Sequence, residues 1–319
     1  MPAVTVIIPA YNAERYLPHC LDSVQEQTLA DWEIVAVNDG STDSTGEILE
    51  AARDSRVRVF HTDNNGPGPA RNTGIRHARG EYIFFLDADD YLPGNDVLAT
   101  LYRCAREQGV EVCGGGLVRD MDGVIVGPPE TEMRFAKSGL VRFADYQYEY
   151  GYYRFLYRTE FLRKNGIGFP RLARYEDPVF LVRALNTAKF FYALPMTSYC
   201  LRIYPHVVWD WPLVNDLLTG VAEVADFARQ HQFWELQRRQ VKRVWQDYRG
   251  AILNVLHSAS RLRMVRRLHD FYLNYLNLGR IHQHIPDLYP SLMRAFGIGM
   301  ADLLLLHSGE PAASRHVTF

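Results

Sequence analysis

Two aspartates at the end of an apolar run are the residues of this sequence best suited to chemistry. The run Tyr82–Leu86 is typical of a strand buried on both faces, and Asp87, Asp89 and Asp90 follow it directly. Open α/β sheets bind their ligands at the carboxyl ends of central strands. Two carboxylates spaced by one residue can hold a divalent cation that keeps positions free for phosphate oxygens. Capping of the next helix is the alternative. We assign the site to Asp87 and Asp89, and Asp90 to the loop.

Alternating strands and helices must position this site. Over the first hundred residues the sequence predicts four strands separated by helices: Val4–Ile8, Glu33–Val37, Val57–Phe60 and Tyr82–Leu86. Such alternation indicates βαβ units and an α/β fold with a parallel sheet. The Gly/Pro-rich loop at 64–69 precedes the third of these helices.

The middle of the chain is mixed, and the end is helical. We expect a helix over Asp96–Gln108, a strand over Glu111–Val118 and a hairpin turn at Gly123. Asp177-Pro178 predicts a helix start with aspartate as the cap. Later segments are predicted to form a strand pair, Phe190–Leu194 and Ser198–Ile203. From about Trp211 the pattern is wholly helical, so we place a domain boundary at 209, between regions 1–209 and 210–319.

Composition indicates a soluble globular protein of roughly two domains. The chain has 319 residues, of which 47% are hydrophobic and 23% charged. No stretch approaches the roughly 18 apolar residues that span a bilayer, and Met1-Pro2-Ala3 does not resemble the start of a signal peptide. The four cysteines form no CxxC pair, which favours thiols in a reducing cytoplasm.

Charge is distributed unevenly along the chain. Residues 231–319 hold 12 Arg and Lys against 6 Asp and Glu, whereas the preceding part holds 23 against 31. This asymmetry suggests an anionic partner for the helical region, and we prefer peripheral contact with the inner face of a membrane that carries a lipid-linked acceptor. A homo-oligomer contact is the alternative. Nucleic acid is not expected, because no recognised binding module is present.

Several ordered segments carry a longer resemblance. They are VTVIIPAYNAERYLPHCLDSVQEQT, EIVAVNDGSTDST, NNGPGPARNTGIRHARGEYIFFLDADDYL, FLYRTEFLRKNGIGFP and YEDPVF, and they span roughly Val4–Ile203. In this order they resemble the family 2 glycosyltransferases of the GT-A fold. The resemblance implies a Rossmann-like, mixed and mostly parallel sheet flanked by helices, with an all-helical extension. It also implies nucleotide-sugar binding by about 1–110 and the acceptor side in about 111–209.

The resemblance assigns the donor nucleotide to residues that follow the first two strands. Pro9, Tyr11 and Glu14 lie where the family holds the base and ribose, and a tyrosine there can stack on a base. Asp39 lies where the family accepts a hydrogen bond from the uracil ring, which favours a UDP-sugar. Capping of the following helix is the competing role for Asp39.

The Gly/Pro loop is flanked by two further donor-binding candidates, Asn65 and Arg71. Glycines allow close approach of the backbone to a ligand, and a helix N-terminus favours anions. Arg71 offers a permanently charged fork for phosphate or ribose oxygens, although it could equally pair with an acid. No Gly-Lys-Ser/Thr follows, so the loop is not a Walker motif.

The resemblance makes Asp87 and Asp89 the DxD element. It implies that Asp89 is a direct ligand of Mn²⁺ or Mg²⁺ and that Asp87 contacts the ribose or the metal. Such an ion neutralises charge on the leaving diphosphate. His206 stands where a third ligand is often supplied, and Arg202 is placed to assist the diphosphate.

Glu176-Asp177 matches the acidic pair that precedes a helix in this family. The resemblance implies that Asp177 is the base that deprotonates the acceptor hydroxyl in an inverting displacement, with Glu176 orienting or binding the acceptor. An aspartate that caps a helix is stabilised as an anion, so we expect a low pKa and a weak base.

Aromatic residues could form the acceptor platform, although most aromatics belong to protein cores. The candidates are Tyr146, Tyr148, Tyr150, Tyr152, Tyr153, Trp209 and Trp211. We therefore expect an inverting, metal-dependent, hexosyltransferase-type enzyme of bacterial surface polysaccharide assembly, acting on a glycan or lipid-linked acceptor. An inactive nucleotide-sugar or glycan-binding module is the alternative. A dehalogenase-like phosphatase is rejected, because Tyr91 stands where its pattern needs Thr or Val.

Overall fold

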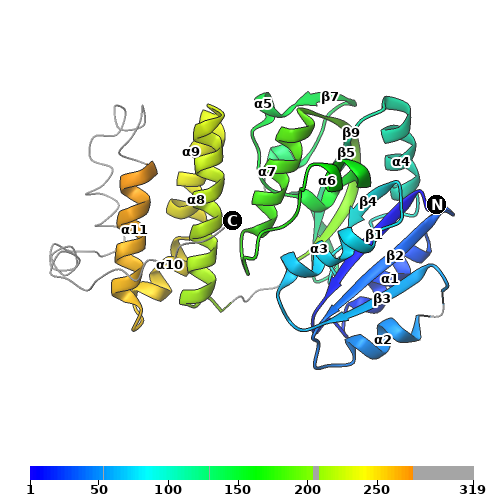
Figure 1. The fold of residues 1–319 in the computed structure, drawn as a ribbon, viewed down its shortest axis with the longest axis horizontal. Helices are drawn as coiled ribbons and strands as arrows, with labels where there is room; N and C mark the ends of the chain where they lie inside the picture. Colours follow the sequence, from blue (N-terminus) through cyan, green and yellow to red (C-terminus); the bar gives the residue numbers. More distant parts are fainter. Residues whose placement is uncertain (53, 129, 204–207, 276–319) are drawn as a thin grey trace. The chain divides into compact units, whose positions relative to one another are not determined.

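The computed structural model describes residues 1–52, 54–128, 130–203 and 208–275. The chain forms two compact units, Met1–His206 and Val207–Phe319, and each is described by itself. Figure 1 shows an α/β architecture for the first unit and helices for the second.

One nine-stranded mixed sheet organises the first unit (Figure 1). Its strand order is β3-β2-β1-β4-β8-β5-β9-β7, and β6 pairs with β5. β3, β2, β1 and β4 are parallel to one another, and β5 is parallel to β9. β8 runs antiparallel to both β4 and β5, and β7 runs antiparallel to β9. The strands are β1 Val4–Ala10, β2 Trp32–Asp39, β3 Val57–Thr62, β4 Tyr82–Phe85, β5 Val112–Met121, β6 Val124–Val126, β7 Gly139–Arg142, β8 Phe155–Arg158 and β9 Phe190–Arg202.

Helices connect the strands and cover the sheet. Those of the first unit are α1 Leu17–Gln25, α2 Thr45–Ala51, α3 Pro67–His77, α4 Val97–Gln108, α5 Phe143–Tyr146, α6 Thr159–Lys164 and α7 Glu176–Ala188. Two 3₁₀ turns, η1 Thr131–Met133 and η2 Tyr152–Arg154, lie in the longer connections. This is the mixed sheet flanked by helices that the sequence predicts.

The central strands are buried on both faces, as a run of β-branched and aromatic residues predicts. Val4, Val6 and Ile8 of β1 belong to a core that includes α1 and α4. The intervening Ile7 faces α3, where it meets Gly74. Helical layers on the two faces therefore fix the plane of the sheet and the edge at which its parallel strands end.

Two predicted boundaries differ from the structure. The predicted strand pair Phe190–Leu194 and Ser198–Ile203 is one continuous strand, β9, in which Pro195 is accommodated where the register with β5 shifts. The predicted cap of α7 is also wrong, because Asp177 lies inside the first turn and Tyr175 is the N-cap. The first N–H groups of a helix have no acceptor within the helix, so Pro178, which lacks an N–H, is tolerated at the third helical position. The hairpin at Gly123 is confirmed, since β5 and β6 pair across it.

The second unit is helical throughout its described part. It contains α8 Trp211–Gln230, α9 Trp234–Lys242, the π-helical segment η3 Arg243–Asp247, α10 Arg249–Leu256 and α11 Arg261–Tyr275. α8 buries one apolar face, and Arg267 of α11 donates a hydrogen bond to Thr219 of α8. Among the described residues, none of the helices combines the length and apolarity that crossing a membrane requires.

Candidate active site

A buried arginine joins two carboxylates from distant parts of the sequence. Arg71 of α3 donates from Nη2 to Oδ1 of Asp87 at 2.7 Å and from Nη1 to Oε1 of Glu176 at 2.8 Å. Asp87 follows β4, and Glu176 begins α7. The Arg71 side chain is only 6% exposed, and that of Glu176 only 9%. Three elements therefore meet at one cation, at the edge where the parallel strands end.

The positive charge of Arg71 and the negative charges of Asp87 and Glu176 compensate one another. A buried ion is tolerated only when partners satisfy it, and the planar guanidinium can serve two carboxylates at once. Burial alone would lower the pKa of Arg71, but Asp87, Tyr152 and Glu176 raise it well above its usual value. The guanidinium also lies over the rings of Tyr152 and Phe169, at 5.0 and 5.2 Å from their centroids. Arg71 is thus a fixed, fully charged part of the site.

The peptide and side chain of Asp87 are held by two tyrosines. The Tyr152 hydroxyl donates to Oδ1 of Asp87 at 3.2 Å, and the Asp87 N–H donates to the Tyr199 hydroxyl at 3.1 Å. Tyr199 in turn donates to Oδ2 of Asp90 at 2.6 Å. The Arg202 N–H donates to the other Asp90 oxygen at 2.7 Å. Asp90 therefore ties the end of β9 to the turn that carries Asp87.

Asp90 lies in the loop after β4, as expected, but it is buried and has a structural role there. The residue is 1% exposed, and burial together with Asp89 and Asp87 raises the pKa of its carboxyl well above the usual range. Sequence pattern did not reveal this role, and it also missed Tyr199. A hydrophobic run that ends in three close carboxylates shows that a polar site exists, but not which carboxylate points inward.

Asp89 lies close to Asp87 in a partly buried position. Burial, followed by the charge of Asp87, raises the pKa of Asp89 to about 6. The main-chain carbonyl of Asp89 accepts a hydrogen bond from Nη1 of Arg202 at 2.7 Å. The Arg202 guanidinium also lies over the ring of Tyr91, 4.7 Å from its centroid. Arg202 is therefore part of the scaffold of the DxD turn.

Asp177 lies next to the cation but is not bonded to it. Burial and the neighbouring Glu176 raise the pKa of Asp177 well above its usual value, and the opposing effect of Arg71 is smaller. The expectation of a low pKa was wrong for a physical reason. The residue does not cap α7, and the hydrogen bond from its own N–H and the charge of Arg71 lower the pKa by less than burial beside Glu176 raises it.

The predicted uracil-binding residue orders the loop before α3. Asp39 is 3% exposed and accepts hydrogen bonds from the N–H groups of Asn65, at 3.1 Å, and Gly66, at 2.8 Å. The Thr62 hydroxyl donates to it at 3.0 Å. Asp39 does not cap α2, for which Ser44 is the N-cap. The side chain of Asn65 donates to the carbonyl of Asp63 at 2.7 Å.

The other donor-side candidates lie at the end of β1 or just after it. The Tyr11 side chain is 52% exposed, and Pro9 is half-buried within β1. Glu14 accepts a hydrogen bond from the N–H of Ser44 at 3.0 Å, so it stabilises the start of α2. The structure brings these three residues and Asp39 to the carboxyl ends of β1 and β2, where a ligand of an open sheet would lie.

Asp87 and Asp89 are the candidate ligands of a divalent cation among the described residues. Within the described ranges no cluster of three or more His, Cys, Asp and Glu side chains is arranged to hold a metal, and His206 lies outside them. The two aspartates nevertheless fit a divalent cation. Burial, and after it the charge of Asp87, raises the pKa of Asp89, and a bound cation would favour the ionised form of both carboxylates.

Most of the predicted acceptor aromatics are core residues. Tyr148 and Tyr152 are buried at 0% and 1% exposure, while Tyr146, Tyr150 and Tyr153 are partly buried and pack on the same core. Tyr153 stacks on Tyr199 with centroids 4.2 Å apart. Trp209 and Trp211 belong to the second unit.

Comparison with known proteins defines the class to which this fold and site belong. The model of "Glycosyl transferase family 2" matches residues 5–169, which is more than half of the chain. The chain belongs to glycosyl transferase family 2.

Curated relatives are bacterial glycosyltransferases. The uncharacterized glycosyltransferase EpsJ of Bacillus subtilis is 35% identical over 66% of this chain and 64% of its own length. The putative glycosyltransferase EpsH of the same organism is 32% identical over 64% of this chain and 61% of its own. The poly(ribitol-phosphate) beta-glucosyltransferase of Bacillus spizizenii is 34% identical over 58% and 30%. The chain thus spans a little under two thirds of its first relatives.

Solved structures confirm the GT-A fold. The structure of S. aureus TarS 1–349 in complex with UDP-GlcNAc superposes with a TM-score of 0.69 and covers 86% of this chain and 82% of that one. Sequence identity is 23%, so the likeness concerns the fold.

Proposed function

We propose that this chain is an inverting, metal-dependent glycosyltransferase that moves a sugar from a UDP-sugar to a hydroxyl of a glycan or lipid-linked acceptor in bacterial surface polysaccharide assembly. The observation that carries the proposal is the pairing of Arg71 with Asp87 on one side and Glu176 on the other. Arg71 links the DxD turn to the acidic helix start that holds Asp177. In this proposal the residues that bind the leaving diphosphate and the residue that deprotonates the acceptor are both held in place by Arg71.

The donor side is supported by position and by the relatives. Asp39, Asn65 and the start of α3 lie at the carboxyl ends of β1 and β2, and Tyr11 is exposed just after β1. TarS has been solved with UDP-GlcNAc and with UDP, which favours uridine here. The carboxylate of Asp39 already accepts hydrogen bonds from the loop, so binding of the uracil N–H would replace one of them. We therefore propose that Asp39 binds uracil with one oxygen and holds the loop with the other.

Asp177 is the proposed base. Its pKa is raised by burial and by Glu176, and a base is most effective when its pKa approaches the working pH. The carboxylate would accept the proton of the acceptor hydroxyl while that oxygen attacks the anomeric carbon. Glu176, held by Arg71, would fix the orientation of the first turn of α7.

The leaving diphosphate requires positive charge, which this chain supplies in part. Asp87 and Asp89 would hold Mn²⁺ or Mg²⁺, which neutralises charge on the diphosphate when bound. Arg71 would contribute a fixed positive charge beside Asp87, and Arg202 would keep the Asp89 peptide in place. His206 remains a proposed third ligand.

The acceptor is proposed from the relatives and from charge. One relative is named as a poly(ribitol-phosphate) beta-glucosyltransferase, and the excess of Arg and Lys in residues 231–319 suits an anionic surface. We propose peripheral membrane contact on the cytoplasmic side, with a homo-oligomer contact as the other use of this region. Removal of residues 211–319, followed by liposome flotation and sizing, separates them. Loss of self-association without loss of lipid binding would contradict membrane contact.

A thermal-shift panel of nucleotide sugars tests the function. The correct donor should raise the melting temperature most, and EDTA should cancel the shift, because a ligand stabilises the state that binds it. Asp177→Asn should retain the shift and lose sugar transfer. A shift without transfer in the wild type would indicate a binding module. No metal-dependent shift with any nucleotide sugar would contradict the proposal.

A further inference from the structure

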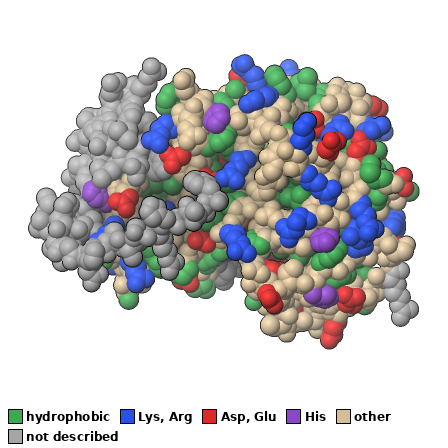
Figure 2. Space-filling model, viewed as in Figure 1, with side chains coloured by type: hydrophobic (Ala, Val, Ile, Leu, Met, Phe, Trp, Pro, Cys, Tyr) green, Lys and Arg blue, Asp and Glu red, His purple; other side chains and the backbone are tan. Residues whose placement is uncertain are grey.

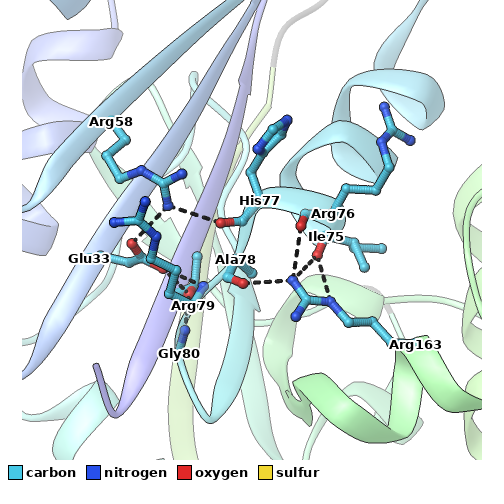
Figure 3. Close-up of polar contacts among 10 residues, drawn as sticks. Glu33, Arg58, Ile75, Arg76, His77, Ala78, Arg79, Gly80 and Arg163 are labelled. Carbon is cyan, nitrogen blue, oxygen red and sulfur yellow. Dashed lines mark hydrogen bonds and ion pairs between the residues drawn. The ribbon is translucent and has the colours of Figure 1, made fainter. Parts of the chain in front are cut away.

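The C-terminal turn of α3 is held by an arginine from another helix (Figure 3). Arg163 of α6 donates from Nε and Nη2 to the carbonyl oxygen of Ile75, at 3.1 and 2.6 Å. The same Nη2 donates to the carbonyls of Arg76, at 3.1 Å, and Ala78, at 2.6 Å. One side chain thus serves three carbonyls that the helix itself leaves without partners.

A second arginine completes this arrangement. Arg58 of β3 donates from Nη1 to the carbonyl of His77 at 2.9 Å. Cations near a helix C-terminus are favourable, and here arginine must provide them. Burial, with Arg58, Arg76 and Arg163, lowers the pKa of His77, which disfavours a positive charge on its ring. We call Arg163 and Arg58 the α3 clamp.

The same point fixes the turn that leads from α3 to β4. Glu33 of β2 accepts hydrogen bonds from Nη1 of Arg58 at 3.2 Å, from the N–H of Arg79 at 2.6 Å and from the Thr5 hydroxyl at 2.7 Å. Thr5 in turn accepts from the N–H of Gly80 at 2.8 Å. Figure 3 shows Glu33, Arg79 and Gly80 beside the clamp. α3 and β4 therefore share one anchored end.

The same two elements carry the site, at the middle of α3 and after the end of β4. α3 bears Arg71 and β4 leads to Asp87, and these residues form the 2.7 Å ion pair. Between Arg71 and the clamped turn, Gly74 lies directly on β1, where an added Cβ would come within 2.3 Å of Cγ2 of Ile7. α3 is one continuous 11-residue helix, and its start is also closely packed, since an added Cβ at Gly68 would come within 2.6 Å of the carbonyl oxygen of Pro170. Its turns are joined by backbone hydrogen bonds, so they shift together. Movement of its last turn must then move Arg71.

We propose that Arg163 is a positioning residue for Arg71, acting through the clamped C-terminal turn of α3. Its side chain is remote from the carboxyl ends of the strands, because it contacts the turn that precedes β4 rather than the one that follows it. The inference rests on the proposed function, in which Arg71 supplies charge beside the leaving diphosphate. It adds a remote residue to that site.

Matched variants test this role through UDP affinity, measured by calorimetry with Mn²⁺ present. Arg163→Met should weaken UDP binding roughly two- to thirtyfold, the range by which remote residues change coupling. Arg163→Lys keeps the charge but loses the planar guanidinium, so its UDP affinity should lie between those of Arg163→Met and the wild type. If Arg163→Met does not fold, Arg163→Lys is used for the test instead. Arg76→Met is the control. Its side chain bonds only Thr73, at 2.8 Å, among the described contacts.

The control is needed because Lys and Arg side chains gather on this face of the first unit (Figure 2). If charge alone mattered, Arg76→Met would weaken UDP binding as much as Arg163→Met. Equal losses would overturn the proposal, and so would unchanged affinity in both Arg163 variants. Absence of UDP binding in the wild type would instead contradict the proposed function.

A second background separates positioning from general stability. In Arg71→Lys, the Arg163→Met change should no longer weaken UDP binding, because the group it positions is already altered. Its effect on the urea midpoint should persist in both backgrounds. If Arg163→Met weakens UDP binding by the same factor in the wild type and in Arg71→Lys, then Arg163 does not act through Arg71.

Discussion

Replacing Arg71 with methionine should destabilise the first unit far more than the loss of any surface ion pair. Arg71 makes hydrogen bonds of 2.7 and 2.8 Å to two carboxylates, and its side chain is 6% exposed. Hydrogen bonds to charged groups contribute about 1.5–3 kcal/mol each. Breaking a buried pair by removing one partner costs about 3–5 kcal/mol, because the other charge stays buried. We expect Arg71→Met to lower the unfolding free energy by about 3–5 kcal/mol.

The two carboxylates should respond differently to this loss. The Asp87 side chain is 23% exposed and keeps its bond from Tyr152, whereas Glu176 is 9% exposed. Most of the penalty should therefore come from Glu176. In the wild type, Glu176→Gln removes half of an ion pair and should destabilise. In Arg71→Met it removes an unpaired charge and should restore about 1–3 kcal/mol, within the penalty for burying an unsatisfied group.

Urea unfolding followed by circular dichroism measures these differences. At a slope of roughly 2–3 kcal/mol per molar urea, a loss of about 3–5 kcal/mol shifts the unfolding midpoint by about 1–2.5 M. Arg106→Met is the matched control, since Arg106 bonds Glu81 at the same 2.8 Å but is 57% exposed, and it should change the midpoint little. The reasoning is refuted if both arginine variants lose equal stability, or if Glu176→Gln destabilises in both backgrounds.

Three further changes test other parts of the site. Asp177→Asn should gain stability over wild type as pH rises from 4 to 8: a carboxyl whose pKa is raised in the fold loses stability on ionising, and Asn does not ionise. A difference in urea midpoint between Asp177→Asn and the wild type that stays the same at every pH would contradict this. Tyr199→Phe removes bonds to Asp90 and from the Asp87 N–H, and urea titration should show a loss of about 1–3 kcal/mol. Gly74→Ala should cost about 1–3 kcal/mol through overpacking on Ile7, whereas Gly250→Ala, with open space at its Cβ, should be neutral or stabilising; equal effects would refute the close contact.

Pattern and spacing predicted the sheet and the position of its carboxylates. The run before Asp87 forms β4, and the alternation of strands and helices gives the parallel part of the sheet. These features are local, because burial on both faces requires an apolar run and turn chemistry marks its end. β9 was predicted as two strands because Pro195 interrupts the run, and a register shift against β5 is not visible in one strand alone.

The partners of the charged residues could not be predicted in the same way. Arg71 and Glu176 are 105 positions apart, and their pairing depends on how α3 and α7 approach each other. The sequence left open whether Arg71 meets phosphate or an acid. Asp90 and Asp89 are neighbours of the same type, yet only Asp90 points to Tyr199. Such choices follow from tertiary packing and not from spacing.

The prediction for Asp177 failed on the same ground and shows how the site is coupled. A helix cap would have stabilised its charge, but Tyr175 is the cap, with φ of 71°, and Asp177 lies beside Glu176 instead. Burial and Glu176 raise the pKa of Asp177, and the attraction of Arg71 opposes this rise. Arg71 therefore acts on two carboxylates through one charge. It bonds Asp87 after β4 and lowers the pKa of Asp177, so the placement of α3 affects the turn after β4 and the start of α7 together.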